Sequence, residues 1–452
     1  MSKNIESERR ENARSGSPDK TKTAIAASMG TMVENYDFLA YATASALYFG
    51  TVFFPDNDPV IGTLLAFATL AVGFVVRPLG GIIGGYMGDR YGRKPVLVTA
   101  LVVMGVATAA IGLLPTYENA GILAPILLLV LRVVQGLSFG AEWGSAVTMT
   151  YEHAPWRRRG FFTSIPLAGG PLGVGLASIV FLASASLPGD WAWRVPFLAS
   201  TVLIVIGLII RVGISETPEF TTLKKDGNVV KNPLAKVLRE NWRDILRIIA
   251  MRIAEGTGYY VIATYLLSYV TSNELVTRDV ALTGSLIGSA VAVCLICFIG
   301  RLSDTVGRKP IYIVACLGVI AYAFPAFALA NSGSPFLIAL AFVIGIGVVW
   351  AMFGGAQGAW FSELFSTGVR SSGASLGYQL APVITGFSPF IAALLAAQFG
   401  WVGPALLMVL AGLIGLVGVL TTRETWGAER RAQVDAFIAG VDESVLETSP
   451  QK

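Results

Sequence analysis

Long apolar segments alternate with short polar ones along almost the entire chain. A helix needs about 20 apolar residues to cross the hydrocarbon core of a bilayer, and twelve segments are long enough. They are expected at 24–54, 60–87, 95–114, 122–150, 160–187, 192–212, 245–270, 280–300, 310–330, 335–361, 371–398 and 401–421. The pattern therefore predicts an all-α polytopic membrane protein with twelve transmembrane helices.

A polar, lysine-rich interval divides the twelve predicted helices into two sets of six. The expected organisation is a cytoplasmic tail at 1–23, a six-helix bundle at 24–213, a linker at 214–244, a second bundle at 245–422 and a tail at 423–452. The linker contains Pro218 and Pro233, which interrupt helices, and we interpret it as a tether between the bundles.

Composition agrees with the membrane prediction. Of 452 residues, 54% are hydrophobic and 14% charged, whereas a soluble protein carries about 25% charged residues. The mean hydropathy is +0.66. So few charges could not cover a soluble fold, which excludes the soluble and disordered classes. The net charge of +4 does not indicate nucleic-acid binding, because the basic residues form short clusters between apolar runs. The three cysteines and one histidine form no metal-ligand pattern, so no metal or other cofactor is expected.

Lysine and arginine give the predicted orientation, because short cytoplasmic loops carry an excess of both. The two tails and the even-numbered loops hold 28 of the 33 basic residues, whereas the odd-numbered loops hold only Arg278. We therefore expect both termini in the cytoplasm. The remaining four basic residues, Arg77, Arg132, Arg194 and Arg252, lie in spans or at their edges.

Two charged patterns recur half a chain apart. The loop after the second span, GYMGDRYGRKP at 85–95, reappears 215 residues later as GRLSDTVGRKP at 300–310. A glutamate and an arginine of the fourth loop recur 211 residues later in the tenth. Repeats at half the chain length predict two pseudo-symmetric six-helix bundles, which in transporters rock about a site near the bilayer midplane.

The repeated charges are candidates for a cytoplasmic gate. Ion pairs confined to one side of the membrane would hold that side closed and break when it opens. The gate candidates are Asp89, Arg90, Arg93, Glu152, Arg159, Asp304, Arg308, Glu363 and Arg370. The alternative is that these charges serve only topology and helix-end capping. Gating is favoured because charges of both signs recur at equal offsets.

The first and fourth spans carry ionisable residues at membrane depth, where charge is costly and by default functional. Glu34, Asp37 and Tyr41 share one helix face. Desolvation and proximity favour proton uptake by carboxylates, so the two acids are candidate proton-coupling residues; a structural hydrogen-bonding pair is the alternative. Arg132 and Gln135 share a face of the fourth span. We expect an Asp37–Arg132 pair in which protonation of the aspartate frees the arginine for a substrate carboxylate. A purely structural salt bridge is the alternative.

The seventh span opens the second bundle with a comparable set. Arg252 and Glu255 lie at i,i+3, where they either neutralise each other or take part in substrate binding and proton coupling. The hydroxyls of Tyr259 and Tyr260 suit a polar substrate.

Further polar residues complete the candidate site. Arg77 in the second span either forms part of an anion pathway or meets a carboxylate such as Glu142, itself a proton-coupling candidate. The remaining substrate-binding candidates are Tyr36, Tyr41, Gln135, Trp360 and Gln379.

These motifs resemble those of known proteins. The repeated glycine–aspartate–arginine loop resembles the loop signature of the major facilitator superfamily, and this resemblance covers essentially the whole chain. The sequences ENYDFLAY from Glu34, RPLGG from Arg77, RVVQGLSFGAEWG from Arg132 and WRVPF from Trp193 look like the metabolite:proton symporter family. Within that family the chain is most similar to shikimate-type transporters, including GYQ and SPF in the eleventh span.

The resemblance implies the major facilitator fold and proton-driven import of a small organic acid across the cytoplasmic (inner) membrane of a bacterium. A shikimate-like hydroxylated carboxylate is favoured. Alternatives are 2-oxoglutarate, citrate or proline/betaine, or a substrate sensor that no longer transports. The tails are too short for a signalling domain and lack the heptads of osmosensing members, which disfavours the last two.

No enzymatic motif occurs in a credible context, so the chain is not expected to be an enzyme. Its expected partners are the organic acid, protons and the lipid bilayer, with the proton gradient as the driving force and no nucleic acid. We expect it to act as a monomer.

Overall fold

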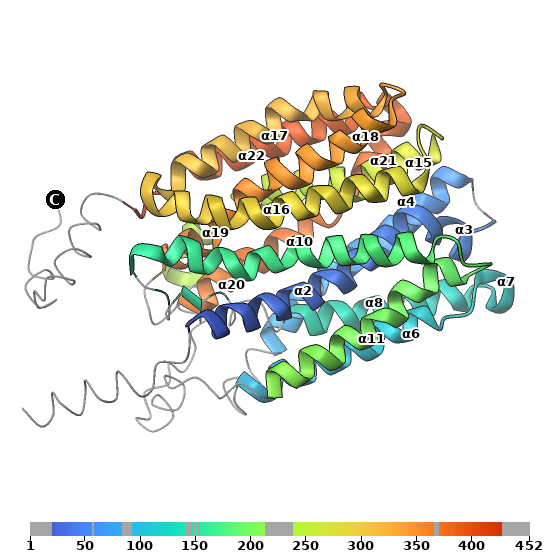
Figure 1. Ribbon diagram of the computed structural model, residues 1–452, viewed down its shortest axis with the longest axis horizontal. Helices are drawn as coiled ribbons and strands as arrows, with labels where there is room; N and C mark the ends of the chain where they lie inside the picture. Colours follow the sequence, from blue (N-terminus) through green and yellow to red (C-terminus); the bar gives the residue numbers. More distant parts are fainter. Residues whose placement is uncertain are drawn as a thin grey trace, which may run out of the picture.

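The computed structural model describes residues 20–56, 58–83, 93–140, 156–212, 238–365 and 370–426, together with 147, 150, 151 and 154. Every regular element in these residues is helical. Most of the long helices run along the longest dimension of the molecule (Figure 1). We refer to residues 20–212 as the N-terminal half and to residues 238–426 as the C-terminal half.

The N-terminal half contains six long helices and several short segments. In chain order its elements are α2 (Lys20–Ala44), η1 (Ser45–Phe49), α3 (Gly50–Phe53), α4 (Pro59–Val75), α6 (Arg93–Gly112), α7 (Tyr117–Ala120), α8 (Leu123–Gly140), η2 (Trp156–Arg158), α10 (Arg159–Ser184) and α11 (Trp191–Val212). The start of α4 is specified locally, because the Asp58 side chain accepts a hydrogen bond from the Val60 N–H (2.9 Å) and proline occupies the first turn.

The C-terminal half likewise consists of long helices joined or interrupted by short helical segments. Its elements are α14 (Trp242–Tyr260), η3 (Val261–Leu266), α15 (Leu267–Ser272), α16 (Arg278–Val306), α17 (Arg308–Ala330), α18 (Pro335–Phe342), η4 (Val343–Trp350), α19 (Ala351–Glu363), α20 (Arg370–Thr385), α21 (Ser388–Phe399) and α22 (Val402–Thr421). All twelve predicted spans have a helical counterpart, and most of their ends differ by a few residues. The exceptions are the second span, whose predicted end at 87 lies outside the described residues, and the fourth, where α8 ends at Gly140 and the predicted end at 150 lies among residues described only in part.

Nine helices in the described part of the chain are long and apolar enough to cross a membrane. A shorter apolar helix, Val98–Gly112, represents the third span. The first and seventh spans fall outside this set although both are helical. The physical reason is that these two helices carry the buried charges of the candidate site, which lowers their mean hydropathy.

Local irregularities interrupt four spans, and the sequence pattern did not predict them. The segments η1, η3 and η4 are π-helical, an irregularity often found at functional sites. The eleventh span breaks between α20 and α21, at Gly386 and Phe387.

The two halves meet along α10 and α16, which lie side by side in the middle of the molecule (Figure 1). Small residues allow this close approach: a Cβ atom added at Gly300 would lie 2.4 Å from the Ser164 hydroxyl, and one at Gly160 would lie 2.5 Å from the Gly300 carbonyl oxygen. Close packing through small residues is typical of helices in membranes.

Candidate functional site

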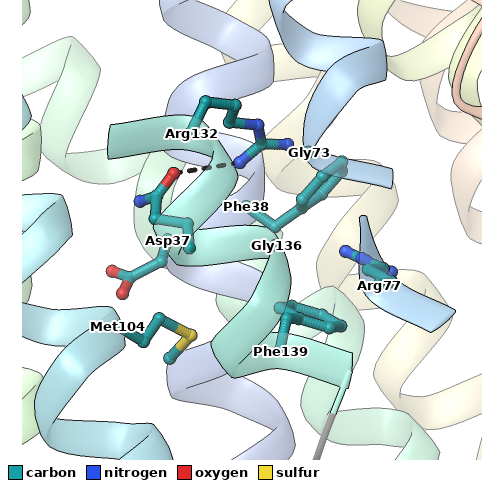
Figure 2. A pocket seen from close by; sticks show the side chains of 9 residues that line it. Asp37, Phe38, Gly73, Arg77, Met104, Arg132, Gly136 and Phe139 are labelled. Atoms are coloured by element: carbon teal, nitrogen blue, oxygen red, sulfur yellow. Dashed lines mark hydrogen bonds between the residues drawn. The ribbon is translucent and has the colours of Figure 1, made fainter. Parts of the chain in front are cut away.

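A small buried cavity lies in the N-terminal half, beside the interface with the other half. Side chains from α2, α6 and α8 and from the helical segment that begins with α4 line it: Asp37, Phe38, Gly73, Arg77, Met104, Arg132, Gln135, Gly136 and Phe139. Figure 2 shows the two arginines and Asp37 arranged around the Phe38 ring. The cavity volume is about 10 Å³, room for about one water molecule. An organic acid could enter only if the surrounding helices move apart.

A chain of hydrogen bonds connects Arg132 to Asp37. Arg132 Nη1 donates to Gln135 Oε1 (3.1 Å), and Gln135 Nε2 donates to the Thr108 hydroxyl (2.7 Å). That hydroxyl lies 2.9 Å from Asp37 Oδ2 and also 2.9 Å from the Met104 carbonyl oxygen. The Thr108 hydroxyl can therefore donate either to the carboxylate or to the carbonyl. The predicted direct Asp37–Arg132 ion pair is therefore wrong, because the polar side chains of Thr108 and Gln135 stand between the two charges.

Neither arginine of the cavity forms an ion pair with a carboxylate in the described residues, although both are buried. Aromatic rings surround them instead. The Arg77 guanidinium lies 3.6 Å from the centre of the Phe139 ring and 4.4 Å from that of Phe74. Arg132 lies 4.2 Å from the Tyr41 ring. Cation–π contacts stabilise a buried cation by about 2 kcal/mol, less than a carboxylate could provide.

The Phe38 ring is shared by both arginines. Its centre lies 4.9 Å from the guanidinium carbon of Arg77 and 4.8 Å from that of Arg132. The two guanidinium carbons can therefore be no farther apart than the sum of these distances, 9.7 Å. Two cations so close favour the binding of an anion between them or beside them.

The C-terminal half contains a second buried polar cluster, and here the charge is neutralised. Arg252 Nη1 lies 2.5 Å from Glu255 Oε2 on the same helix, α14. Gln357 Nε2, from α19, donates to Glu255 Oε1 (3.2 Å), and the Arg252 guanidinium lies 3.8 Å from the Tyr378 ring of α20. The two residues of this i,i+3 pair therefore form an ion pair, and their part in substrate binding and proton coupling stays a prediction.

Aromatic contacts join the two clusters across the interface. The Tyr260 ring lies 5.2 Å from that of Phe74 and 5.8 Å from that of Phe38. Tyr259 instead packs on Trp350, with 4.7 Å between ring centres. Of the two substrate-binding candidates Tyr259 and Tyr260 in the seventh span, Tyr260 is the one that borders cavity-lining residues of the other half.

Contacts between the halves close the predicted cytoplasmic end. Asp304, at the end of α16, accepts hydrogen bonds from the Gly160 N–H (2.8 Å) and the Phe161 N–H (3.0 Å) in the first turn of α10. Arg308 is fully buried and lies 2.9 Å from Asp304 and 3.3 Å from Glu363. The structure thus brings three gate candidates together, and gating itself stays a prediction.

The two halves also make a contact at the opposite end. The Arg278 guanidinium lies 4.8 Å from the Tyr48 ring, and this ring stacks on Phe181 at 6.2 Å.

The polar groups of several predicted residues bind partners other than the two arginines, although the Tyr41 ring lies 4.2 Å from Arg132. The Tyr36 hydroxyl donates to the Pro196 carbonyl (2.7 Å) and the Tyr41 hydroxyl to Thr69 (2.8 Å). Trp360 was expected to bind substrate, but its indole donates to the Arg423 carbonyl (3.2 Å) and its ring packs on Tyr312. This position near the gate argues against substrate contact by Trp360. Arg159 binds the Tyr151 hydroxyl (2.9 Å).

Some candidates lie outside the described residues: Asp89, Arg90, Glu142 and Glu152. For Arg93 and Arg370 only the backbone is described. Glu34 is buried one helical turn from Asp37 and interacts electrostatically with Arg77.

The sequence analysis missed Thr108, the central member of the hydrogen-bond chain. Its only signal was a hydroxyl within an apolar span, and such hydroxyls usually bond to the backbone of their own helix. It also missed Gly73, where an added Cβ would lie 2.3 Å from Arg132 Nε. Only the tertiary structure reveals that approach.

A membrane fold of two six-helix halves, with buried charges where they meet, defines a secondary transporter. Residues 38–386 match the model of the Major Facilitator Superfamily, and the chain belongs to this superfamily. It is therefore a multi-pass membrane transporter, not an enzyme, and the predicted twelve-helix fold is confirmed.

Curated relatives are similar over nearly their whole length. The inner membrane metabolite transport protein YhjE of Escherichia coli K12 is 36% identical over 423 residues, which cover 90% of this chain and 94% of YhjE. The shikimate transporter of the same organism is 36% identical, over 89% of this chain and 94% of its own. A proline/betaine transporter of E. coli is 33% identical, over 89% of this chain and 83% of that transporter.

Solved structures share the fold at lower identity. A crystal structure of a D-xylose-proton symporter superposes with a TM-score of 0.67 at 19% identity, over 87% of this chain and 97% of that one. A partially occluded inward open form of the xylose transporter XylE from E. coli superposes with a TM-score of 0.68 at 19% identity, over 90% of this chain and 99% of that one.

Proposed function

We propose that the protein is a proton-coupled symporter that imports a small organic acid, favouring a shikimate-like hydroxylated carboxylate, across the cytoplasmic membrane of a bacterium. The observation that carries this proposal is a pair of buried arginines that form no ion pair with a carboxylate among the described residues. One of them is connected to a buried aspartate by a chain of hydrogen bonds. The similarity to a transporter named for shikimate supports the substrate class.

Arg132 and Arg77 would bind the substrate carboxylate. An anion that enters the cavity replaces cation–π contacts by charge-assisted hydrogen bonds, which are shorter and stronger. The Nε–H of Arg132, which has no hydrogen-bond partner among the described residues, is one donor that would gain a partner. The small size of the present cavity means that binding accompanies a change from an open to an occluded state.

Asp37 would bind the proton. While it is ionised, the Thr108 hydroxyl can donate to it. A protonated carboxyl group becomes a donor itself, and the same hydroxyl can then donate to the Met104 carbonyl, which is equally close. Gln135 donates to Thr108 in both cases, so protonation removes negative charge from the end of a chain that begins at Arg132. A cation that has lost this compensation attracts the substrate carboxylate more strongly.

Uptake by purified protein in proteoliposomes tests the proposal. An inward proton gradient is expected to drive accumulation of radiolabelled shikimate, and a protonophore that collapses the gradient should abolish accumulation. Accumulation that persists after the collapse would contradict proton coupling. Competition by citrate, 2-oxoglutarate and betaine would identify the preferred class.

A matched pair of variants tests the assignment to Asp37. Asp37→Asn should abolish accumulation against a gradient while still allowing exchange of substrate between the two sides. Asp279→Asn removes an exposed carboxylate from the first turn of α16 and should transport like the wild type. Normal concentrative uptake by Asp37→Asn would refute the assignment.

A further inference from the structure

We infer that Gln379 of α20 binds a hydroxyl group of the substrate and thereby selects hydroxylated acids over their unsubstituted parents. This inference rests on the proposed function, because it assigns the neutral part of the substrate to the C-terminal half while the arginines of the N-terminal half hold its carboxylate.

The side-chain amide of Gln379 is buried and has no hydrogen-bond partner in the part of the chain that the structure describes. The residue is 4% exposed, and both its Nε2 and its Oε1 lack a partner. Leaving a buried polar group unpaired is costly, and such groups in native proteins call for an explanation. By contrast, Gln135 and Gln357, the other buried glutamines of the two clusters, each accept a hydrogen bond through Oε1 and donate one through Nε2.

The face of α20 that carries Gln379 is directed at the N-terminal half. Gly386 follows it by seven residues, which at 100° per residue brings the two within about 20° of each other around the helix; the bond from the Gly386 N–H to the Pro382 carbonyl (2.8 Å) continues the helix to this point. A Cβ atom added at Gly386 would lie 2.1 Å from the Phe74 ring. That ring is one of those that surround Arg77.

The neighbouring residue supports the same placement. Tyr378 lies against Arg252 of the C-terminal cluster, and it interacts electrostatically with Glu34 and Arg77 of the other half. The segment of α20 around 378 and 379 is therefore close to the charged groups of both halves.

An unpaired amide at this position suits a hydroxyl group. A glutamine offers both a donor and an acceptor, so it can complete both hydrogen-bonding roles of an alcohol without competing for the carboxylate. A site built to bind a hydroxyl rejects the analogue that lacks it, because its own polar groups then stay unpaired. Gln379 would thus stabilise the bound hydroxylated substrate. When the parent acid binds, the amide would stay without a hydrogen-bond partner, and binding would be weaker.

The test compares two acids of the same skeleton, shikimate and cyclohex-1-ene-1-carboxylate, on wild type and Gln379→Met. Methionine has a similar length and no amide. Affinities are measured by competition binding, and thermal unfolding is followed without ligand. The wild type should prefer shikimate. The variant should lose about 10- to 100-fold in shikimate affinity, with the affinity for the parent acid changed less than about threefold.

Thermal unfolding separates recognition from a structural role. Because Gln379 makes no hydrogen bond in the empty protein, Gln379→Met should unfold at the same or a higher temperature than the wild type. The control Gln357→Met removes the hydrogen bond to Glu255 and should unfold at a lower temperature, with equal loss of affinity for both acids.

The inference fails if Gln379→Met lowers the affinity for both acids equally or keeps the wild-type preference for shikimate. It also fails if the variant unfolds at a lower temperature than the wild type. Equal affinity of the wild type for the two acids would also overturn it, without affecting the arginine site. The proposed function fails separately if Arg132→Met still binds the parent acid as the wild type does.

Discussion

The first helix of each half places a carboxylate and a tyrosine at matching positions. Asp37 and Glu255 are 218 residues apart, as are Tyr41 and Tyr259. In each case the carboxylate lies in a buried cluster with a glutamine from the fourth span of its own half. The backbone repeat is thus accompanied by a repeat of polar positions.

The charge around the two carboxylates differs. Glu255 is neutralised by Arg252, one turn earlier in the same helix, whereas the matching position before Asp37 is Glu34, a second acid. The cation nearest to Asp37 along the hydrogen bonds is Arg132, which belongs to another helix and is reached through two polar side chains. The C-terminal cluster is therefore an internally compensated ion pair, while the N-terminal cluster leaves its arginines available to a ligand.

The largest effect should come from breaking the compensated pair. Arg252→Met leaves Glu255 buried without its counter-charge, which typically costs 3–5 kcal/mol, and should sharply lower the unfolding temperature in detergent. Arg252→Met combined with Glu255→Gln removes both charges and should recover most of the loss. A double variant no more stable than the single one would contradict compensation as the role of the pair.

The same change in the N-terminal half should act on binding instead. Arg132→Met should lower substrate affinity by about 100-fold or more, because it removes a buried charge that would pair with the carboxylate. The unfolding temperature of the empty protein should fall much less than in Arg252→Met, since Arg132 has no carboxylate partner among the described residues and loses only hydrogen bonds and ring contacts. Strong destabilisation without ligand would show that the two clusters do not differ as described.

Gly73→Ala should disturb the position of Arg132 without removing its charge. The added methyl group would lie 2.3 Å from Nε and 2.7 Å from Cζ of Arg132, so the guanidinium must shift. A displacement of this size should lower affinity about 10-fold, measured by equilibrium binding. Gly81→Ala is the control, because its Cβ would make only an ordinary 3.4 Å contact with the Gly140 carbonyl oxygen.

Phe38→Leu should have the smallest effect. It removes one cation–π contact from each of the two arginines, contacts worth about 0.5–2 kcal/mol, while others remain. We expect an affinity about threefold lower in the same binding assay. Phe53→Leu, which truncates a buried ring packed on Phe49 and Trp193, should leave affinity unchanged; an equal loss in both variants would assign the effect to packing.

Membrane class, number of spans and internal symmetry could be predicted from the sequence because each depends on patterns of fixed period or long apolar runs. Helix-face arguments also placed Arg132 and Gln135 on one side of the fourth span, and both line the cavity, since positions three apart share a face of a helix. The contact between Arg252 and Glu255 could be predicted for the same reason, because the two residues are three positions apart on one helix. The expected Asp37–Arg132 contact failed because it depended on the packing of three helices, including the one that contributes Thr108.

The sequence by itself thus determined the helices, their pseudo-repeat and which few charges lie at membrane depth, because burial of a charge in a span is visible as an interruption of an apolar run. Only the tertiary structure decided which of those charges are compensated. It placed Thr108 between Asp37 and Arg132, aromatic rings around Arg77, and the buried amide of Gln379 where no described residue forms a hydrogen bond with it. Compensation depends on contacts a few ångströms long between helices distant in the chain, and no local pattern encodes these distances.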